Sequence, residues 1–166
     1  MITPDWVRMM ARYNAWQNRW MIEAMATLPE GEAERDRGAF FGSILGTANH
    51  LLWGDEMWMS RFDDLPAPEI DGANAVRLTP DVAAWTARRK TTDGAILDWA
   101  GRLTECGGDL TWHSGITGTD ISRDKATLYT HVFNHQTHHR GQIHAMLTAA
   151  GATTGTTDLA FMPDDA

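Results

Sequence analysis

The sequence has a single cysteine, Cys106, among its 166 residues, so one chain cannot close a disulfide on itself. It also lacks any apolar stretch close to the roughly 18 uninterrupted residues that a membrane-spanning helix needs. Residues 1–5 do not show the basic and then apolar order of a secretion signal. We therefore expect a cytoplasmic protein that does not enter a membrane.

Basic residues are also scarce. Lys and Arg number 14 against 22 Asp and Glu, which gives a formal net charge of −8. Sequence-independent binding of nucleic acid needs positive charge to neutralise the phosphates. Because this chain is acidic, nucleic acid is not an expected partner. The only basic run is Arg88-Arg89-Lys90, which we interpret as the solvated surface of a helix.

Periodic apolar residues predict four helices. The first begins with Thr3 as N-cap and Pro4 at the first helical position. The others are expected over residues 38–62, from Thr79-Pro80-Asp81 to about residue 103, and over 124–150 before Gly151. Residues 105–123 are rich in Gly, Thr and Ser, and 110–113 with 119–121 fit a short hairpin. We therefore predict an all-α four-helix bundle with a short irregular or hairpin insert before the last helix.

The length fits one domain, which we assign to residues 1–151, followed by a polar and loosely ordered tail over 152–166. Eight tryptophans and nine methionines suggest broad apolar faces. The second predicted helix is apolar around most of its circumference, so it must be covered on most sides. We expect a second copy of the chain to supply that cover, and hence a homodimer.

Five of the seven histidines fall in or just after the segment Thr130–Gln142, and His135 and His139 are four residues apart. On a helix this spacing stacks two imidazoles on one face, about 6 Å apart along the axis. Such a pair can bind one metal ion from one side. The candidate third ligand is His50, because Gly46 and Gly54, one turn to either side, leave room around its imidazole.

Other histidines offer alternatives. His131 precedes His135 by four residues and could replace His139 in the pair. We rank His139 higher because Gly141 lies close to it and permits the approach of a neighbouring helix. His138 points to the side and is expected at a surface, whereas His113 in the insert fits either a substrate contact or a solvated position.

A helical wheel centred on His135 sharpens the expected orientation of the last helix. It puts Gln142 and Met146 on the same stripe as the histidine pair, and that stripe is expected to face the core. It puts Phe133 and His144 on the far side.

Three motifs give the chain a resemblance to the DinB-like (YfiT-like) superfamily. They are Tyr13–Asn18 in the first helix, Asn49–Trp53 in the second and Asn134–Gln142 in the last. The resemblance implies an up-down-down-up four-helix bundle that is usually dimeric. It also implies one divalent metal ion per chain, often nickel or zinc, with His50, His135 and His139 as ligands. Characterised members include transferases and isomerases that use bacillithiol or mycothiol.

Three imidazoles with one open position are typical of catalytic metal sites. Helical zinc peptidases carry a glutamate directly after the first histidine, but Gln136 stands there, which argues against a peptidase. Asp55, Glu56 and Asp120 could each supply a carboxylate, although we interpret Asp55 and Glu56 as surface acids. The pattern favours transfer of a low-molecular-weight thiol to a small-molecule electrophile. A metal-dependent hydrolase and a non-catalytic, metal-stabilised binding protein stay open as alternatives.

Overall fold

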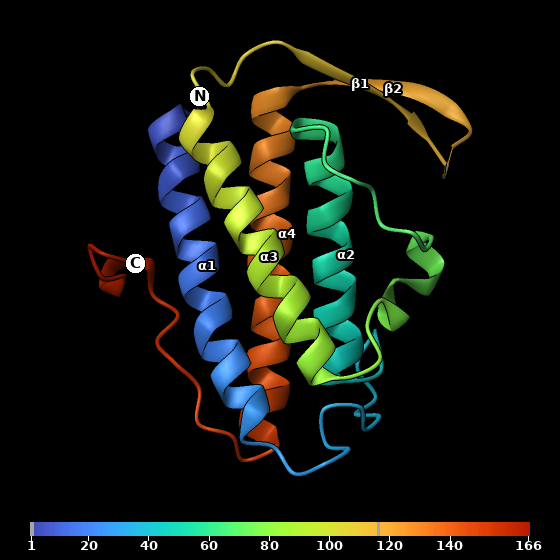
Figure 1. The fold of residues 1–166 in the computed structure, drawn as a ribbon, viewed down its shortest axis with the longest axis vertical. Coiled ribbons are helices and arrows are strands. Elements are labelled where there is room, and N and C mark those ends of the chain that lie inside the picture. Colours follow the sequence, from blue (N-terminus) through green and yellow to red (C-terminus); the bar gives the residue numbers. More distant parts are fainter. Residues whose placement is uncertain (1, 116) are drawn as a thin grey trace.

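The computed structural model describes residues 2–115 and 117–166. Four long helices lie side by side, as Figure 1 shows: α1 (Pro4–Ala26), α2 (Ile44–Phe62), α3 (Val82–Arg102) and α4 (Lys125–Ala149). Short 3-10 helices span Gly72–Arg77 (η1) and Leu159–Phe161 (η2). An antiparallel hairpin of β1 (Asp109–Ser114) and β2 (Thr119–Asp124) precedes α4. The mostly helical character and the hairpin insert predicted from the sequence are confirmed.

The helices run in two directions. In Figure 1, α1 and α4 run from the top to the bottom of the molecule, and α2 and α3 run the opposite way. Helix α1 packs mainly against α3, and α2 packs mainly against α4. The second pairing places the helix that carries His50 beside the helix that carries His135 and His139. Within the residues that the structure describes, no helix is long and apolar enough to cross a membrane.

The helix starts follow their capping residues. As predicted, the Thr3 hydroxyl accepts a hydrogen bond from the Trp6 N–H, and Pro4 opens α1. The predicted start of α2 at residue 38 was wrong, because Gly38 and Gly42 have φ angles of +67° and +77°, which a helix cannot contain. Ser43 caps α2 instead, and residues 38–43 form a tight turn before it.

The connection between α2 and α3 folds back over the outer face of α2. The indole N–H of Trp53 donates to the carbonyl of Ile70, and the Trp53 ring packs against Gly72. Asn49 is buried and donates to the carbonyls of Val76 and Thr79. The cover that we expected from a second subunit therefore comes from the same chain, so the apolar circumference of α2 no longer argues for a dimer.

The core has three layers along the bundle axis. One apolar cluster includes Met21, Leu52, Trp85 and Ile143, and the other includes Val7, Met59, Trp99 and Phe133. Between them lies a layer of buried polar side chains, which consists of Asn14, Gln17, Asn18, Asp55, Arg89, Asp93, Gln136 and Arg140. The expectation that Phe133 faces away from the core was wrong, because its side chain is fully buried.

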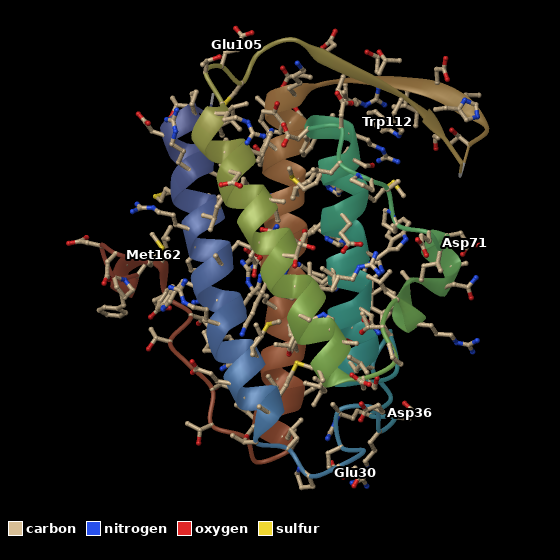
Figure 2. The ribbon with its side chains drawn as sticks, in the orientation of Figure 1. Glu30, Asp36, Asp71, Glu105, Trp112 and Met162 are labelled. Carbon is tan, nitrogen blue, oxygen red and sulfur yellow. The ribbon has the colours of Figure 1, made fainter. Side chains whose placement is uncertain are left out.

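Residues 152–166 return along α1, as the red segment in Figure 1 shows. The hydroxyl of Tyr13 donates to the carbonyl of Thr157 across 2.5 Å, and the amide of Gln17 donates to the carbonyl of Thr156. Gly155 lies so close to Trp20 that an added Cβ atom would come within 2.7 Å of the ring. The tail thus packs against α1 through these contacts. Figure 2 shows the side chains along the helices and the hairpin that lies across one end of them.

Candidate metal centre

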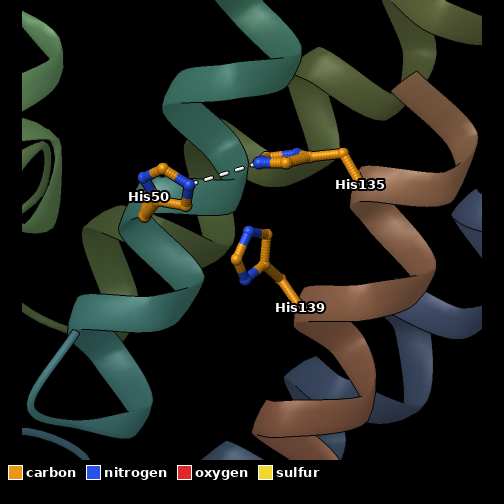
Figure 3. A group of neighbouring side chains, drawn as sticks. All are labelled: His50, His135 and His139. Carbon is orange, nitrogen blue, oxygen red and sulfur yellow. Dashed lines mark hydrogen bonds between the residues drawn. The ribbon is translucent and has the colours of Figure 1, made fainter. Parts of the chain in front are cut away.

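Three histidines meet between α2 and α4, as Figure 3 shows. His50 comes from α2, and His135 and His139 come from successive turns of α4. One ring nitrogen from each lies within 4.8 Å of the other two. The Nε2 atoms of His50 and His135 are only 3.2 Å apart, and the rings of His135 and His139 have centroids 4.4 Å apart.

The donor set fits a divalent metal ion. In a tetrahedral site with metal–nitrogen distances of about 2.0–2.1 Å, two ligand nitrogens lie roughly 3.3 Å apart. The separation of 3.2 Å between Nε2 of His50 and Nε2 of His135 matches that requirement. Imidazole nitrogen is a good ligand for zinc, nickel, copper and iron. The three side chains could therefore bind one ion from one side.

All three imidazoles have pKa values below the usual histidine range. Burial, and then the neighbouring His139, lower the pKa of His50 to about 4. Burial and the surrounding histidines lower the pKa of His135 to about 3. Burial is also the main reason that the pKa of His139 is lowered. The rings are therefore neutral at physiological pH, which is the form that binds a metal.

Neighbouring side chains fix the orientation of two of the rings. Nδ1 of His139 lies 2.7 Å from the amide oxygen of Gln142. Because that oxygen can only accept, Nδ1 carries the proton and Nε2 keeps its lone pair. The ring of Phe41 stacks on His50 with centroids 3.9 Å apart and 21° between the planes. Phe41 lies in the turn at residues 38–43, so this turn supplies one wall of the centre. The sequence pattern did not predict this.

A glycine allows the close approach of α2 to α4. A Cβ atom added to Gly54 would lie 2.9 Å from Cε1 of His135, so a larger residue there would displace the imidazole. Gly141, by contrast, is exposed, and a Cβ atom there would meet nothing within 4 Å. Our reason for preferring His139 over His131 was therefore wrong, although the structure does place His139 in the cluster.

The remaining candidate histidines lie outside the cluster. His131 is exposed, and its ring packs 5.4 Å from that of Trp58. His138 is exposed beside His139. His113 is exposed on the hairpin, where its Nδ1 lies 2.9 Å from a carboxylate oxygen of Asp120. Neither His113 nor Asp120 comes to the centre.

The polar layer of the core lies directly beside the histidine cluster. Asp55 is 1% exposed and accepts hydrogen bonds from Arg89, at 2.6 Å, and from the amide of Gln136, at 3.0 Å. The interpretations of Asp55 as a surface acid and of Arg89 as solvated were both wrong. The signal was present in the sequence, because Asp55 continues the helical stripe of Ala48 and Leu51.

The same layer reaches the other two helices. Arg89 contacts Asp93 at 2.9 Å, and the Asp93 carboxylate accepts from the amide of Asn18 at 2.8 Å. Arg140 donates to the amide oxygen of Asn14. Arg89 is therefore paired with two buried carboxylates, Arg140 is bound to a neutral amide, and the resulting network joins all four helices.

These features define a mostly helical protein with a three-histidine cluster between its second and fourth long helices. The model of the DinB family matches residues 1–166, so this chain belongs to the DinB family. It is 26% identical to Protein DinB of Bacillus subtilis (strain 168) over 161 residues, which are 93% of this chain and 91% of that protein. No solved structure gave a significant match. The resemblance stated from the three sequence motifs is thus confirmed.

Proposed function

We propose that this protein is a metal-dependent transferase that joins a low-molecular-weight thiol to a small electrophile at the His50, His135 and His139 centre. The observation that carries this proposal is the convergence of three neutral imidazoles without a carboxylate. Among residues 2–115 and 117–166, the group able to hold an ion contains these histidines alone. Asp55, whose charge acts on His139, is already paired with Arg89 and Gln136.

The absence of a free base from this group favours a thiol over water as the nucleophile. Gln136 directs its amide N–H to Asp55, and an amide cannot accept the proton of a water molecule. A divalent ion at the three histidines would supply positive charge that lowers the pKa of a thiol reaching it. The thiol proton leaves to solvent, sulfur bonds to the electrophilic carbon, and the leaving group departs with its electron pair.

Several finer features belong to the same proposal. We infer that the four helices form an up-down-down-up bundle, which the opposite directions of the α1/α4 and α2/α3 pairs support. We infer nickel or zinc as the ion, because three imidazoles suit both. A homodimer rests on the family resemblance alone. A cytoplasmic location agrees with a free, buried Cys106.

The test compares the metal-loaded protein with its His139→Ala variant. Each is assayed with cysteine, glutathione, bacillithiol and mycothiol against a chlorodinitroarene, and the thioether product is measured by mass spectrometry. The adjacent and exposed His138→Ala is the matched control. We expect product formation by the wild type and by His138→Ala and its loss in His139→Ala. Equal rates in all three would mean that the ion only ties α2 to α4.

A further inference from the structure

Arg61 occupies the last turn of α2, beside two tryptophans that contact each other. Its guanidinium carbon lies 4.7 Å from the ring centre of Trp58, on the same helix, and 5.3 Å from that of Trp112, on β1. Its side chain is half-buried. Contacts of this length between a guanidinium and aromatic rings are cation–π interactions, which stabilise the side chain in this position without using its N–H donors.

Arg61 differs from the other arginines that are not fully exposed. Those arginines all donate to an acceptor within the chain, and they are Arg8, Arg37, Arg88, Arg89 and Arg140. For Arg61, no hydrogen bond or ion pair is formed with any described residue. Asp63, two positions away, pairs with Arg102 at 2.5 Å instead. The Arg61 nitrogens are not among the buried polar atoms that lack a partner, so its donors reach solvent and are available to an acceptor from outside the chain.

A row of rings leads from the metal centre to this arginine. We call it the aromatic row, and it consists of His139, His135, His131, Trp58 and Trp112. The successive ring centroids lie 4.4, 6.0, 5.4 and 5.6 Å apart. Exposure increases from the buried His139 to the exposed His131, and the two tryptophans beyond it are half-buried. The rings thus form an unbroken series of edge and tilted contacts, in which His131 and the two tryptophans are the members that an apolar molecule can reach most easily.

We propose that Arg61 binds the carboxylate of a small molecule whose body lies along the aromatic row and whose other end reaches the three-histidine centre. The direction toward the centre rests on the proposed function, whereas the anion site itself does not. Arg61 lies three turns beyond His50 on α2, about 16 Å along the axis, which sets the length of such a ligand. The guanidinium fork matches the two oxygens of a carboxylate.

The charge of the site favours a carboxylate over a phosphate. One guanidinium balances one negative charge, and the second charge of a phosphate dianion would need another cation. A nucleic acid is an even poorer fit, because the acidic chain would repel its backbone.

The test uses a matched pair of probes, 3-phenylpropionate and 3-phenylpropionamide, which differ only in the charged group. Binding is measured by isothermal titration calorimetry on the wild type, Arg61→Gln, Arg61→Lys and the exposed control Arg77→Gln. It is repeated on His50→Ala, which removes a proposed metal ligand that is not part of the aromatic row. Thermal unfolding of each variant shows that it is folded.

We expect the wild type to bind the carboxylate at least about tenfold more tightly than the amide, as one charge-assisted contact provides. Arg61→Gln should lose that preference, Arg61→Lys should keep part of it, and Arg77→Gln and His50→Ala should keep all of it. Equal binding of the two probes, no binding of either at millimolar concentration, or an unchanged preference in Arg61→Gln overturns the proposal. Loss of the carboxylate preference in His50→Ala overturns it too, because the carboxylate would then be bound at the metal centre. This measurement detects binding and not catalysis, so its result does not depend on the outcome of the transferase assay.

Discussion

Gln136 donates a hydrogen bond from Nε2 to Oδ1 of Asp55 across 3.0 Å, in the fully buried layer between α4 and α2. Gln136 directly follows His135, and Asp55 directly follows Gly54, against which the His135 ring packs. One buried contact therefore holds the helix that carries two of the histidines against the helix that carries the third. The polar layer contributes to the geometry of the centre as well as to the stability of the fold.

Asp55→Ala should strongly destabilise the protein, because Arg89 would keep its buried charge and lose one of its two carboxylate partners. Removing one member of a buried pair costs about 3–5 kcal/mol. Urea unfolding of the metal-free protein measures this loss. The matched control is Glu56→Ala. It removes the neighbouring acid and its ion pair with the partly exposed Arg88, which should lower the free energy of unfolding by about 1 kcal/mol or less. Equal losses in the two variants would show that the Asp55 contacts are not specially stabilising.

Gly54→Ala should weaken metal binding while the fold is kept. The added methyl group would lie 2.9 Å from His135 Cε1, so the imidazole must move. Displacing the support of a ligand lowers metal affinity by about tenfold or more. Competition with a chromophoric chelator measures the affinity. Gly141→Ala is the control on α4, because a methyl group there meets nothing within 4 Å. Equal metal affinities of Gly54→Ala and the control would mean that metal binding does not depend on the present position of the His135 imidazole.

The stability of the metal-free protein should fall as the pH is lowered from about 6.5. Unfolded histidines take up protons near pH 6.5, whereas the folded pKa values of His50 and His135 are about 4 and about 3. The unfolded chain therefore binds more protons in this interval, so the stability present above pH 6.5 is lost as the pH falls toward 4 and then 3.

Urea unfolding at a series of pH values checks this dependence. A variant with both His50→Ala and His135→Ala should show a shallower loss, and the exposed hairpin variant His113→Ala should behave as the wild type does. If the stability of the double variant fell with pH as steeply as that of the wild type, the groups that titrate would not be His50 and His135.

The histidine pair could be predicted from the sequence because the four-residue spacing acts within a single helix. The meeting with His50 is a contact between two helices, which helical periodicity does not reveal. The flanking glycines Gly46 and Gly54 made His50 a candidate, and the resemblance to known proteins then implied that it is a ligand. The turn at residues 38–43 escaped prediction because its glycines were read as part of α2. The stacking of Phe41 on His50 depends on that turn and could not be inferred without it.

The buried polar layer was not predicted from the sequence, for a different reason. Charged residues are usually solvated, so Asp55 and Arg89 were assigned to the surface. Their positions on the apolar stripes of α2 and α3 favoured burial, but a buried charge needs a partner, and the partner lies on another helix. In the same way, the cover of α2 by residues 63–81 is a tertiary contact that periodicity alone does not reveal.

The metal content of the purified protein tests the central claim most directly. After loading with nickel or zinc and removal of excess ion by gel filtration, inductively coupled plasma mass spectrometry gives the number of ions per chain. We predict one ion per chain in the wild type and in His131→Ala, and loss of the ion in His135→Ala. A full complement of metal in His135→Ala, together with its loss in His131→Ala, would contradict the assignment of His50, His135 and His139 as the ligands.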